Sequence, residues 1–303
     1  MKTINVTLSF FLLISICSCK SITPSQQLPL NVTVEDFNYL YDNKYANQNA
    51  IVLGETVNAR IESMPSAPWK FYKIHNVNSN PIGWTTTVED KILIKSDNID
   101  DELFSSIEYS NPQGMRWDLM TKCEIWICSL SGDKVVKIRK INNKEMIRER
   151  MNDSISLLRL SIKENMKDKI LLRRYTLISP YYKDVSPESG FAEIKPWIFQ
   201  RDIPLLSGKF EILLPQRLFD MKVGMDVVQL GEGEISIQSS FVKATMSYYQ
   251  ENHERTSNDR LRSYNRLITT EYDAEKIVVS VEDVDALSES ENQQPLGIKL
   301  MHH

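Results

Sequence analysis

The chain has 303 residues, of which 42% are hydrophobic and 25% are charged, as in ordinary folded globular proteins. Its 36 basic and 40 acidic residues are interspersed and give a formal net charge of −4. This charge pattern argues against a nucleic-acid-binding protein, which needs a clustered basic face. The length allows one large domain or two small ones, and all-β domains often exceed about 200 residues as a single unit.

The N-terminus has the features of a lipoprotein signal peptide. Lys2 supplies a positive charge, and the mostly apolar region 8–16, at nine residues, is too short to span a bilayer. Ser18 directly precedes Cys19, with Ile16 at position −3. This resembles the lipobox of bacterial lipoproteins, in which the cysteine carries the lipid. We therefore expect residues 1–18 to be removed and Cys19 to be lipidated; an ordinary secretory signal is the alternative.

The segment after Cys19 predicts a tether. Residues 19–45 form a polar lead-in with two prolines, in which residues 35–45 are either a helical turn or a first strand. Lys20, Ser21 and Ile22 stand where surface-exported lipoproteins of some Gram-negative groups carry acids. This favours a lipid-anchored protein of the bacterial cell envelope, at the outer membrane and facing the periplasm.

Two cysteines remain after Cys19, at positions 123 and 128, inside the strand-like run CEIWIC. Five steps along a strand separate them by ~16 Å and turn their side chains to opposite faces. Cysteines whose Cα atoms lie more than ~7 Å apart cannot be bridged. We expect no disulfide, and buried, inert thiols.

Residues 46–287 show short strand-like segments, almost no helical period and no repeats, which predicts a large antiparallel β-sandwich with short helical turns only. The predicted strands are residues 50–61, 69–77, 91–95, 103–109, 122–130, 134–141, 155–162, 170–178, two within 195–215, 223–230, 234–238, 241–249 and 276–281. Hairpin turns are expected at Ser131-Gly132-Asp133 and Gly231-Glu232-Gly233. We expect a helical turn within 143–152, a loop or short helix at 250–266 and a polar tail at 288–303.

The stretch 195–215, KPWIFQRDIPLLSGKFEILLP, predicts two strands joined by a corner. Trp197 and Phe199 are core candidates. Gln200 is expected to hydrogen-bond backbone at the corner. Pro204 and Pro215 mark strand boundaries.

Several segments together resemble a known family, the β-domain of unknown function that precedes transglutaminase-like domains in bacterial envelope proteins. The matching pieces, in the family's order, are NAIVL (49–53), GDKVVKI (132–138), KILLRRYTLISPYY (169–182), WIFQRDIP (197–204) with FEILLP (210–215), and VSVEDVDAL (279–287). The resemblance implies an antiparallel β-sandwich similar to the N-terminal β-domain of zinc aminopeptidases, without established catalytic residues. The chain departs from the family at Lys169-Ile170, where a Gly-Asp-type turn is usual. It also ends where the transglutaminase-like domain would begin.

Catalytic and metal-binding patterns are sparse in the sequence. A Cys-His enzyme would have to use Cys123 or Cys128 with His75, His253 or the pair His302-His303, yet a strand cysteine lacks the helix N-terminus that lowers thiol pKa values. Zinc needs three or four ligands at suitable spacing, and the sequence offers no such set. We expect no metal, no cofactor and no catalytic activity.

Four aromatic residues in or beside predicted loops could bind a ligand by stacking or anchoring a partner: Trp84, Trp117, Tyr181 and Tyr182. The alternative is that they cover the ends of the sandwich. The sequence thus predicts a non-catalytic, lipid-anchored binding or scaffolding module, whose partner is another envelope protein or a surface glycan. Two alternatives are an accessory domain acting with a separate transglutaminase-like or peptidase partner, and a carbohydrate-binding lipoprotein.

Overall fold

The computed structural model describes residues 31–63, 82–97, 106–110, 120–152, 155–180, 196–218, 221–222, 225–255, 261–287 and 294–302. Strands dominate these residues, and the helices are three short 3-10 turns: η1 (Glu35–Leu40), η2 (Asn43–Tyr45) and η3 (Asn143–Glu145). The predicted all-β fold class with short helical turns is confirmed. None of the described helices is long and apolar enough to cross a membrane.

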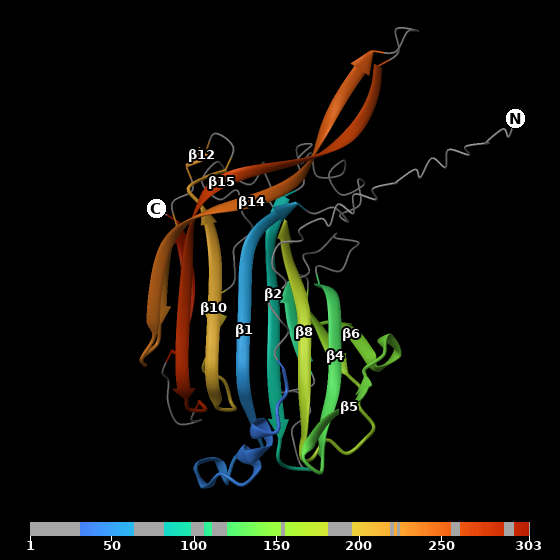
Figure 1. Cartoon of the computed structure of the whole chain (residues 1–303), viewed down its shortest axis with the longest axis vertical. Coiled ribbons are helices and arrows are strands. Elements are labelled where there is room, and N and C mark those ends of the chain that lie inside the picture. The colour runs from blue at the N-terminus through green and yellow to red at the C-terminus, as the bar shows by residue number, and fades with distance from the viewer. Residues whose placement is uncertain are drawn as a thin grey trace, which may run out of the picture.

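An eight-stranded sheet forms the centre of the molecule (Figure 1). Its strands, in order across the sheet, are β14 (Ser236–Arg255), β15 (Leu261–Val284), β10 (Leu205–Pro215), β1 (Ala50–Ser63), β2 (Ile82–Ile94), β8 (Lys169–Pro180), β4 (Met120–Ser131) and β5 (Lys134–Lys140). The β14–β15 hairpin extends well past the ends of the other strands (Figure 1).

One pair of neighbouring strands corrects the expectation of a purely antiparallel sandwich. β1 and β10 run parallel, whereas every other pair of neighbours in this sheet is antiparallel. The parallel ladder begins where the Val52 N–H donates to the Pro204 carbonyl at 2.9 Å. The corner at residues 199–204 therefore delivers β10 to the sheet from the same end as β1.

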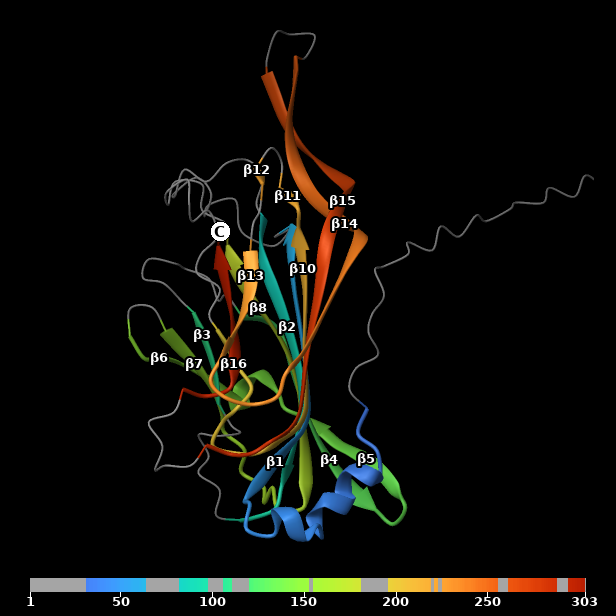
Figure 2. The same cartoon turned by 90° about the vertical axis from the view of Figure 1, so that its left-hand side faces the viewer.

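Three smaller sheets complete the described fold. Two of them lie against one face of the large sheet (Figure 2), and their strands are β13 (Met225–Leu230), β16 (Gly297–His302) and β9 (Trp197–Ile198) in one, and β3 (Ser106–Ser110), β7 (Ile155–Leu160) and β6 (Met146–Arg150) in the other. β11 (Arg217–Leu218) pairs with β12 (Met221–Lys222). This arrangement is the predicted sandwich, with its second layer divided into separate small sheets.

Both faces of the large sheet are covered where β1 begins, which explains the uninterrupted apolar run at the start of that strand. Ala50 and Val52 belong to the main core between the layers, whereas Ile51 and Leu53 belong to a second cluster on the opposite face. A strand buried on both faces reads as a continuous hydrophobic run rather than an alternating one.

The second cluster corrects the boundary of the predicted lead-in. Phe37 and Tyr45, from η1 and η2, are buried against Ile51, Leu93 and other residues of the large sheet. The Lys91 ammonium also donates to the Asn31 carbonyl at 3.3 Å and to the Asp36 carboxylate at 2.9 and 3.0 Å. Residues 31–45 are therefore part of the folded domain.

The predicted polar tail at 288–303 is wrong for its described part. Residues 297–302 form β16, the central strand of a small sheet, and Leu296 and Ile298 are buried in the main core. Two buried apolar side chains, and backbone pairing with β13 along the whole strand and with β9 at Gly297 and Ile298, outweigh the polar composition of the segment.

Other differences concern strand length and pairing. The described parts of the polar run 250–266, residues 250–255 and 261–266, continue β14 and β15 rather than forming a loop or helix. Residues 91–94 of the predicted strand 91–95 form the end of the much longer β2. Within 143–152 a single turn of helix, η3, gives way to β6.

Gly231-Glu232-Gly233 is not a hairpin turn: it connects β13 to β14, which lie in different sheets. Ser131-Gly132-Asp133 does form the predicted hairpin between β4 and β5, with Gly132 at φ 60°.

Candidate functional site

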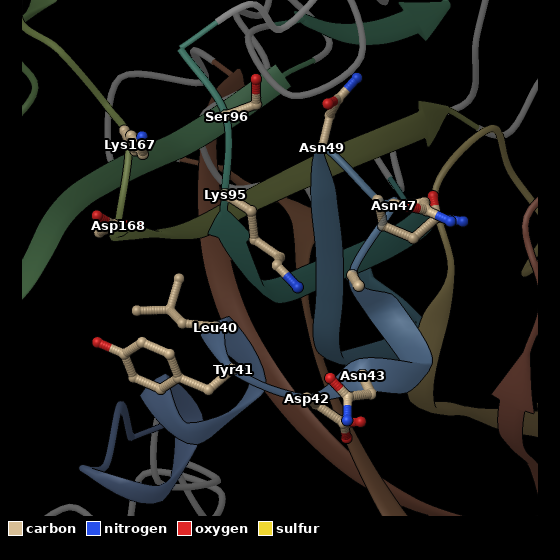
Figure 3. A pocket seen from close by; sticks show the side chains of 12 residues that line it. Leu40, Tyr41, Asp42, Asn43, Asn47, Asn49, Lys95, Ser96, Lys167 and Asp168 are labelled. Carbon is tan, nitrogen blue, oxygen red and sulfur yellow. The ribbon is translucent and has the colours of Figure 1, made fainter.

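A polar pocket opens where η1 and η2 approach the ends of β1 and β2 (Figure 3). Its volume is about 550 Å³. Most of the lining side chains are polar or charged, and the full set is Leu40, Tyr41, Asp42, Asn43, Ala46, Asn47, Gln48, Asn49, Lys95, Ser96, Lys167 and Asp168.

Local hydrogen bonds fix the wall formed by η1 and η2. Asp42 caps η2, since its carboxylate accepts from the Lys44 N–H at 2.9 Å. The buried Tyr45 hydroxyl donates to Asp283 at 3.1 Å, and the Lys44 ammonium lies 3.0 Å from the same carboxylate. These hydrogen bonds lower the pKa of Asp283 and tie η2 to the end of β15.

Lys95 is the half-buried cation of the pocket. Its ammonium donates to the Tyr45 carbonyl at 2.7 Å and to the Tyr39 carbonyl at 3.2 Å, and Figure 3 shows its side chain reaching from the end of β2 toward the η1–η2 segment. Burial lowers the pKa of Lys95, and the negative charge of Asp42 partly opposes that effect.

The charges that line the pocket balance. Lys95 and Lys167 are matched in number by Asp42 and Asp168. The amide side chains of Asn43, Asn47, Gln48 and Asn49 add donors and acceptors, because each amide offers both. Beside them the Tyr41 side chain is 86% exposed. The lining therefore suits a neutral ligand rich in hydrogen-bonding groups, with one aromatic ring available for stacking.

A second concentration of charge lies buried between the layers. Glu55, Asp90 and Arg173 are direct neighbours across β1, β2 and β8, so their side chains share the face that bears the main core. The Arg173 guanidinium donates to both carboxylate oxygens of Asp90, at 2.8 and 2.7 Å. Both side chains are almost fully enclosed.

The corner between β9 and β10 contributes the remaining members of this network. The Trp197 indole N–H donates to Glu55 at 2.9 Å, and the Arg201 guanidinium forms an ion pair with the same carboxylate. Burial raises the pKa of Glu55, reinforced by the charge of Asp90 and opposed by Arg201. Burial likewise raises the pKa of the neighbouring Tyr175.

We interpret the Glu55 network as structural, because its groups bond to one another under the second layer. Gly208, the neighbour of Glu55 on β10, makes this packing possible. A Cβ atom there would lie 2.7 Å from a Val281 methyl group and 3.0 Å from the Phe199 ring. The corner residues thus press directly onto the backbone of the sheet.

The predicted signature of the 195–215 stretch is confirmed. Phe199 is fully buried, and Trp197 is half-buried against the main core. The Gln200 side-chain oxygen accepts from the Leu296 N–H at 3.1 Å, so it does bond to backbone at the corner. Pro204 directly precedes β10 and Pro215 ends it.

Of the two alternatives for the four aromatic residues, ligand binding does not hold for Trp84. It lies within β2 and is only 1% exposed, because the strand begins at Ile82 and turns the indole into the main core. Trp117, Tyr181 and Tyr182 lie outside the described residues, as does Cys19.

Cys123 and Cys128 are free, as expected. Cys128 is buried in the second cluster, whereas Cys123 packs against the main core, so the two thiols lie on opposite faces of the sheet. Cys123 is only half-buried, which corrects the expectation that both are enclosed. His253 and His302 lie in strands, and His75 falls outside the described part of the chain. Among the described residues, no group of three or more His, Cys, Asp or Glu side chains is placed to hold a metal.

The pocket residues were missed by sequence reasoning. Tyr41, Asp42 and the amides that follow belong to a segment predicted as a lead-in, and Lys95 and Asp168 come from distant strand ends. The density of Asn and Asp between residues 42 and 49 is the one signal that could have indicated it.

The chain was compared with family models, curated proteins and solved structures. No family model matches the chain, and no curated protein matches it. One similar solved structure is described as a "putative protease" from Parabacteroides distasonis, at 7% sequence identity and a TM-score of 0.46. The alignment covers 83% of this chain but 40% of that protein. A likeness this distant carries no argument about activity.

Proposed function

We propose that this chain is a non-catalytic, lipid-anchored binding module of the bacterial cell envelope. The observation that carries the binding role is the charge-balanced polar pocket with an exposed tyrosine beside it. The anchor rests on the lipobox-like sequence ending at Cys19, and the envelope setting also on the resemblance to β-domains that precede transglutaminase-like domains.

The ligand that this pocket suits best is a neutral sugar unit of a cell-envelope glycan. Amide, ammonium and carboxylate groups can exchange hydrogen bonds with sugar hydroxyls, while an exposed aromatic ring can stack on the apolar face of a sugar. The volume of about 550 Å³ lies within the range of roughly 300–1,000 Å³ usual for small-molecule sites.

The same proposal places the pocket near the membrane. The described chain begins at Asn31, whose carbonyl accepts from Lys91, and eleven residues separate Asn31 from Cys19. Fully extended, these twelve Cα–Cα steps span at most ~43 Å. The pocket-bearing end of the sheet, where this segment enters, would then reach glycans close to the outer membrane.

A glycan array tests the ligand class. The full chain, purified in mild detergent, should bind neutral sugars, and Lys95→Met should weaken binding, because the variant loses the cation of the pocket. Binding that is unchanged by Lys95→Met would contradict the proposed site. A protease-like chain that co-purifies from native membranes, without any glycan binding, would instead support the accessory role.

A further inference from the structure

The two outer strands of the eight-stranded sheet differ sharply in charge. β5, at one edge, is KVVKIRK and carries four basic residues in seven. Its Arg139 is held by Glu145 and Glu164, from the segments that follow it in the chain. Charged and covered edges are a common way in which proteins prevent strand pairing with other chains.

β14, at the opposite edge, lacks this protection along Ser236–Met246. No described strand pairs with its outer side. The stretch holds one charge, Lys243, which pairs with Asp273 of β15 at 2.8 Å. Two large apolar side chains are exposed on it, Ile237 at 47% and Phe241 at 72%. A long edge with little charge and exposed apolar groups is suited to accept a further strand.

Ile237, Ser239 and Phe241 lie on one face of β14, because side chains alternate along a strand. Ile237 and Ser239 stand opposite Val279 and Ile277, which are buried in the main core. The exposed apolar groups therefore continue the core face of the sheet to its edge.

This spacing is self-complementary about Ser239. If two copies of β14 pair antiparallel with Ser239 at the two-fold axis, Ile237 of each copy faces Phe241 of the other. With the two-fold axis at Ile237, only Ile237 would face its counterpart in the other copy. With the axis at Phe241, only Phe241 would do so. Each cross-strand apolar pair stabilises a sheet, and a two-fold axis provides it twice. The lone charge, Lys243, is already neutralised by Asp273, so the two copies do not repel each other there.

We propose that the chain forms a two-fold dimer through antiparallel pairing of β14 with β14 of a second copy, centred on Ser239. The dimer joins the two large sheets into one. This interface uses no residue of the polar pocket, so it stands or falls independently of the sugar-binding role.

Cysteine cross-linking tests the proposed register in the full chain, purified in mild detergent and carrying Cys123→Ser. Directly opposed residues of antiparallel strands have Cα atoms ~4.5–5.5 Å apart, within reach of a disulfide. Ser239→Cys should therefore give a covalent dimer on mild oxidation. Lys243→Cys is the matched control, because its two copies would lie eight residues apart along the strand, ~26 Å. The Cys123→Ser chain without an added cysteine reports any background.

Sedimentation measures the same interface without a covalent bond. Phe241→Glu should weaken dimerisation at least tenfold while the monomer stays folded, since the side chain is exposed and its replacement adds repelling charges across the axis. The proposal is overturned if Ser239→Cys cross-links no more than Lys243→Cys, or if the unmodified chain sediments as a monomer at tens of micromolar.

Discussion

Glu55 connects the corner between β9 and β10 to the large sheet. Its side chain is fully enclosed and accepts from the Trp197 indole, while Arg201 forms the ion pair at 31% side-chain exposure. A carboxylate removed from water is costly unless it is paired and hydrogen-bonded. The raised pKa of Glu55 shows that these partners do not fully offset the burial.

This imbalance predicts a pH dependence of stability. The pKa of Glu55 in the folded protein lies above its usual 4.5, so the folded state holds a proton that the unfolded state releases. The contribution of Glu55 to the free energy of unfolding should therefore fall as the pH rises from 4.5 through the folded pKa. Urea unfolding of the natural chain and of Glu55→Gln between pH 4 and 8 measures it.

Comparison of the two unfolding curves isolates Glu55, because the other acids titrate in both proteins. The natural chain should lose stability relative to Glu55→Gln as the pH rises. Parallel curves across this range would show that Glu55 is not the strained acid. Arg201 can turn toward water in the variant, since its side chain is partly exposed.

The Asp90–Arg173 pair should behave differently because neither partner can reach water. Arg173→Met leaves the Asp90 carboxylate buried without its partner, which should cost about 3–5 kcal/mol of unfolding free energy. The double variant Asp90→Leu with Arg173→Met should recover most of this loss, because apolar groups replace both charges. Calorimetry of the two proteins gives the comparison. A single variant as stable as the natural chain would rule out the pair as a buried contact.

Individual side chains were predictable where the local sequence itself marks their position in the fold. Phe199 and Gln200 could be assigned from the density of aromatic and proline residues around the corner, and the structure agrees. The partners of Glu55 could not be found this way, because Trp197 is 142 residues away and Asp90 reaches it only through strand register.

At the scale of elements, β16 shows how a polar segment becomes structural. Two apolar residues in it or next to it, Leu296 and Ile298, are buried in the main core, and its backbone pairs with β13 on one side and β9 on the other. The Leu296 backbone also accepts from the Phe199 and Gln200 N–H groups at 2.9 and 3.1 Å. The C-terminal segment therefore holds the corner between β9 and β10 in place through backbone hydrogen bonds and buried apolar contacts.

A large-to-small substitution tests this role. Ile298→Ala should lower the free energy of unfolding by about 2–5 kcal/mol, because it removes a buried side chain and leaves a cavity. Lys299→Ala, the next residue, whose side chain points to the other face of β16, should change it by less than about 0.5 kcal/mol. Chemical denaturation of both variants measures the difference. Equal, small effects would mean that the segment is a loose tail after all.

The sequence predicts most strands but not which strands pair. Alternation and turn residues located β1, β7, β8 and β10 closely, since these depend on local patterns. The Gly231-Glu232-Gly233 turn was misjudged because glycines mark a reversal without saying which sheet the next strand joins. Residues 250–266 are predicted as a loop or short helix because they are polar. The described residues of this run instead extend the β14–β15 hairpin, which is stabilised by its own long ladder of backbone pairs.

At the scale of the whole molecule, the proposed binding pocket lies beside the segment through which the described chain enters the fold. η1 and η2 form both the wall of the pocket and the entry of the chain into the domain. The two-layer architecture was predictable from the strand pattern. The pocket was not, because its lining comes from three separate parts of the chain, near residues 40–49, 95–96 and 167–168.

The proposed anchor has its own test. Cys19→Ser should move the protein from the detergent phase to the aqueous phase in a phase-partitioning experiment on whole membranes, because a lipid-bearing Cys19 is the proposed attachment. Cys17→Ser is the matched control and should still partition with detergent. Continued partitioning of Cys19→Ser with detergent would contradict lipidation at this position.

The central claim is that the polar pocket binds a neutral glycan. The most direct measurement is the equilibrium affinity of the full chain for neutral oligosaccharides released from its own cell envelope, compared with the affinities of Tyr41→Ala and Phe241→Ala. Both substitutions remove an exposed aromatic ring, at 86% and 72% exposure, but only Tyr41 lines the pocket. One stacking contact between a sugar and an aromatic ring is worth roughly 1 kcal/mol, so Tyr41→Ala should weaken binding about fivefold. Phe241→Ala should leave it unchanged. Equal affinities for all three proteins, or no binding by the natural chain, would contradict the account.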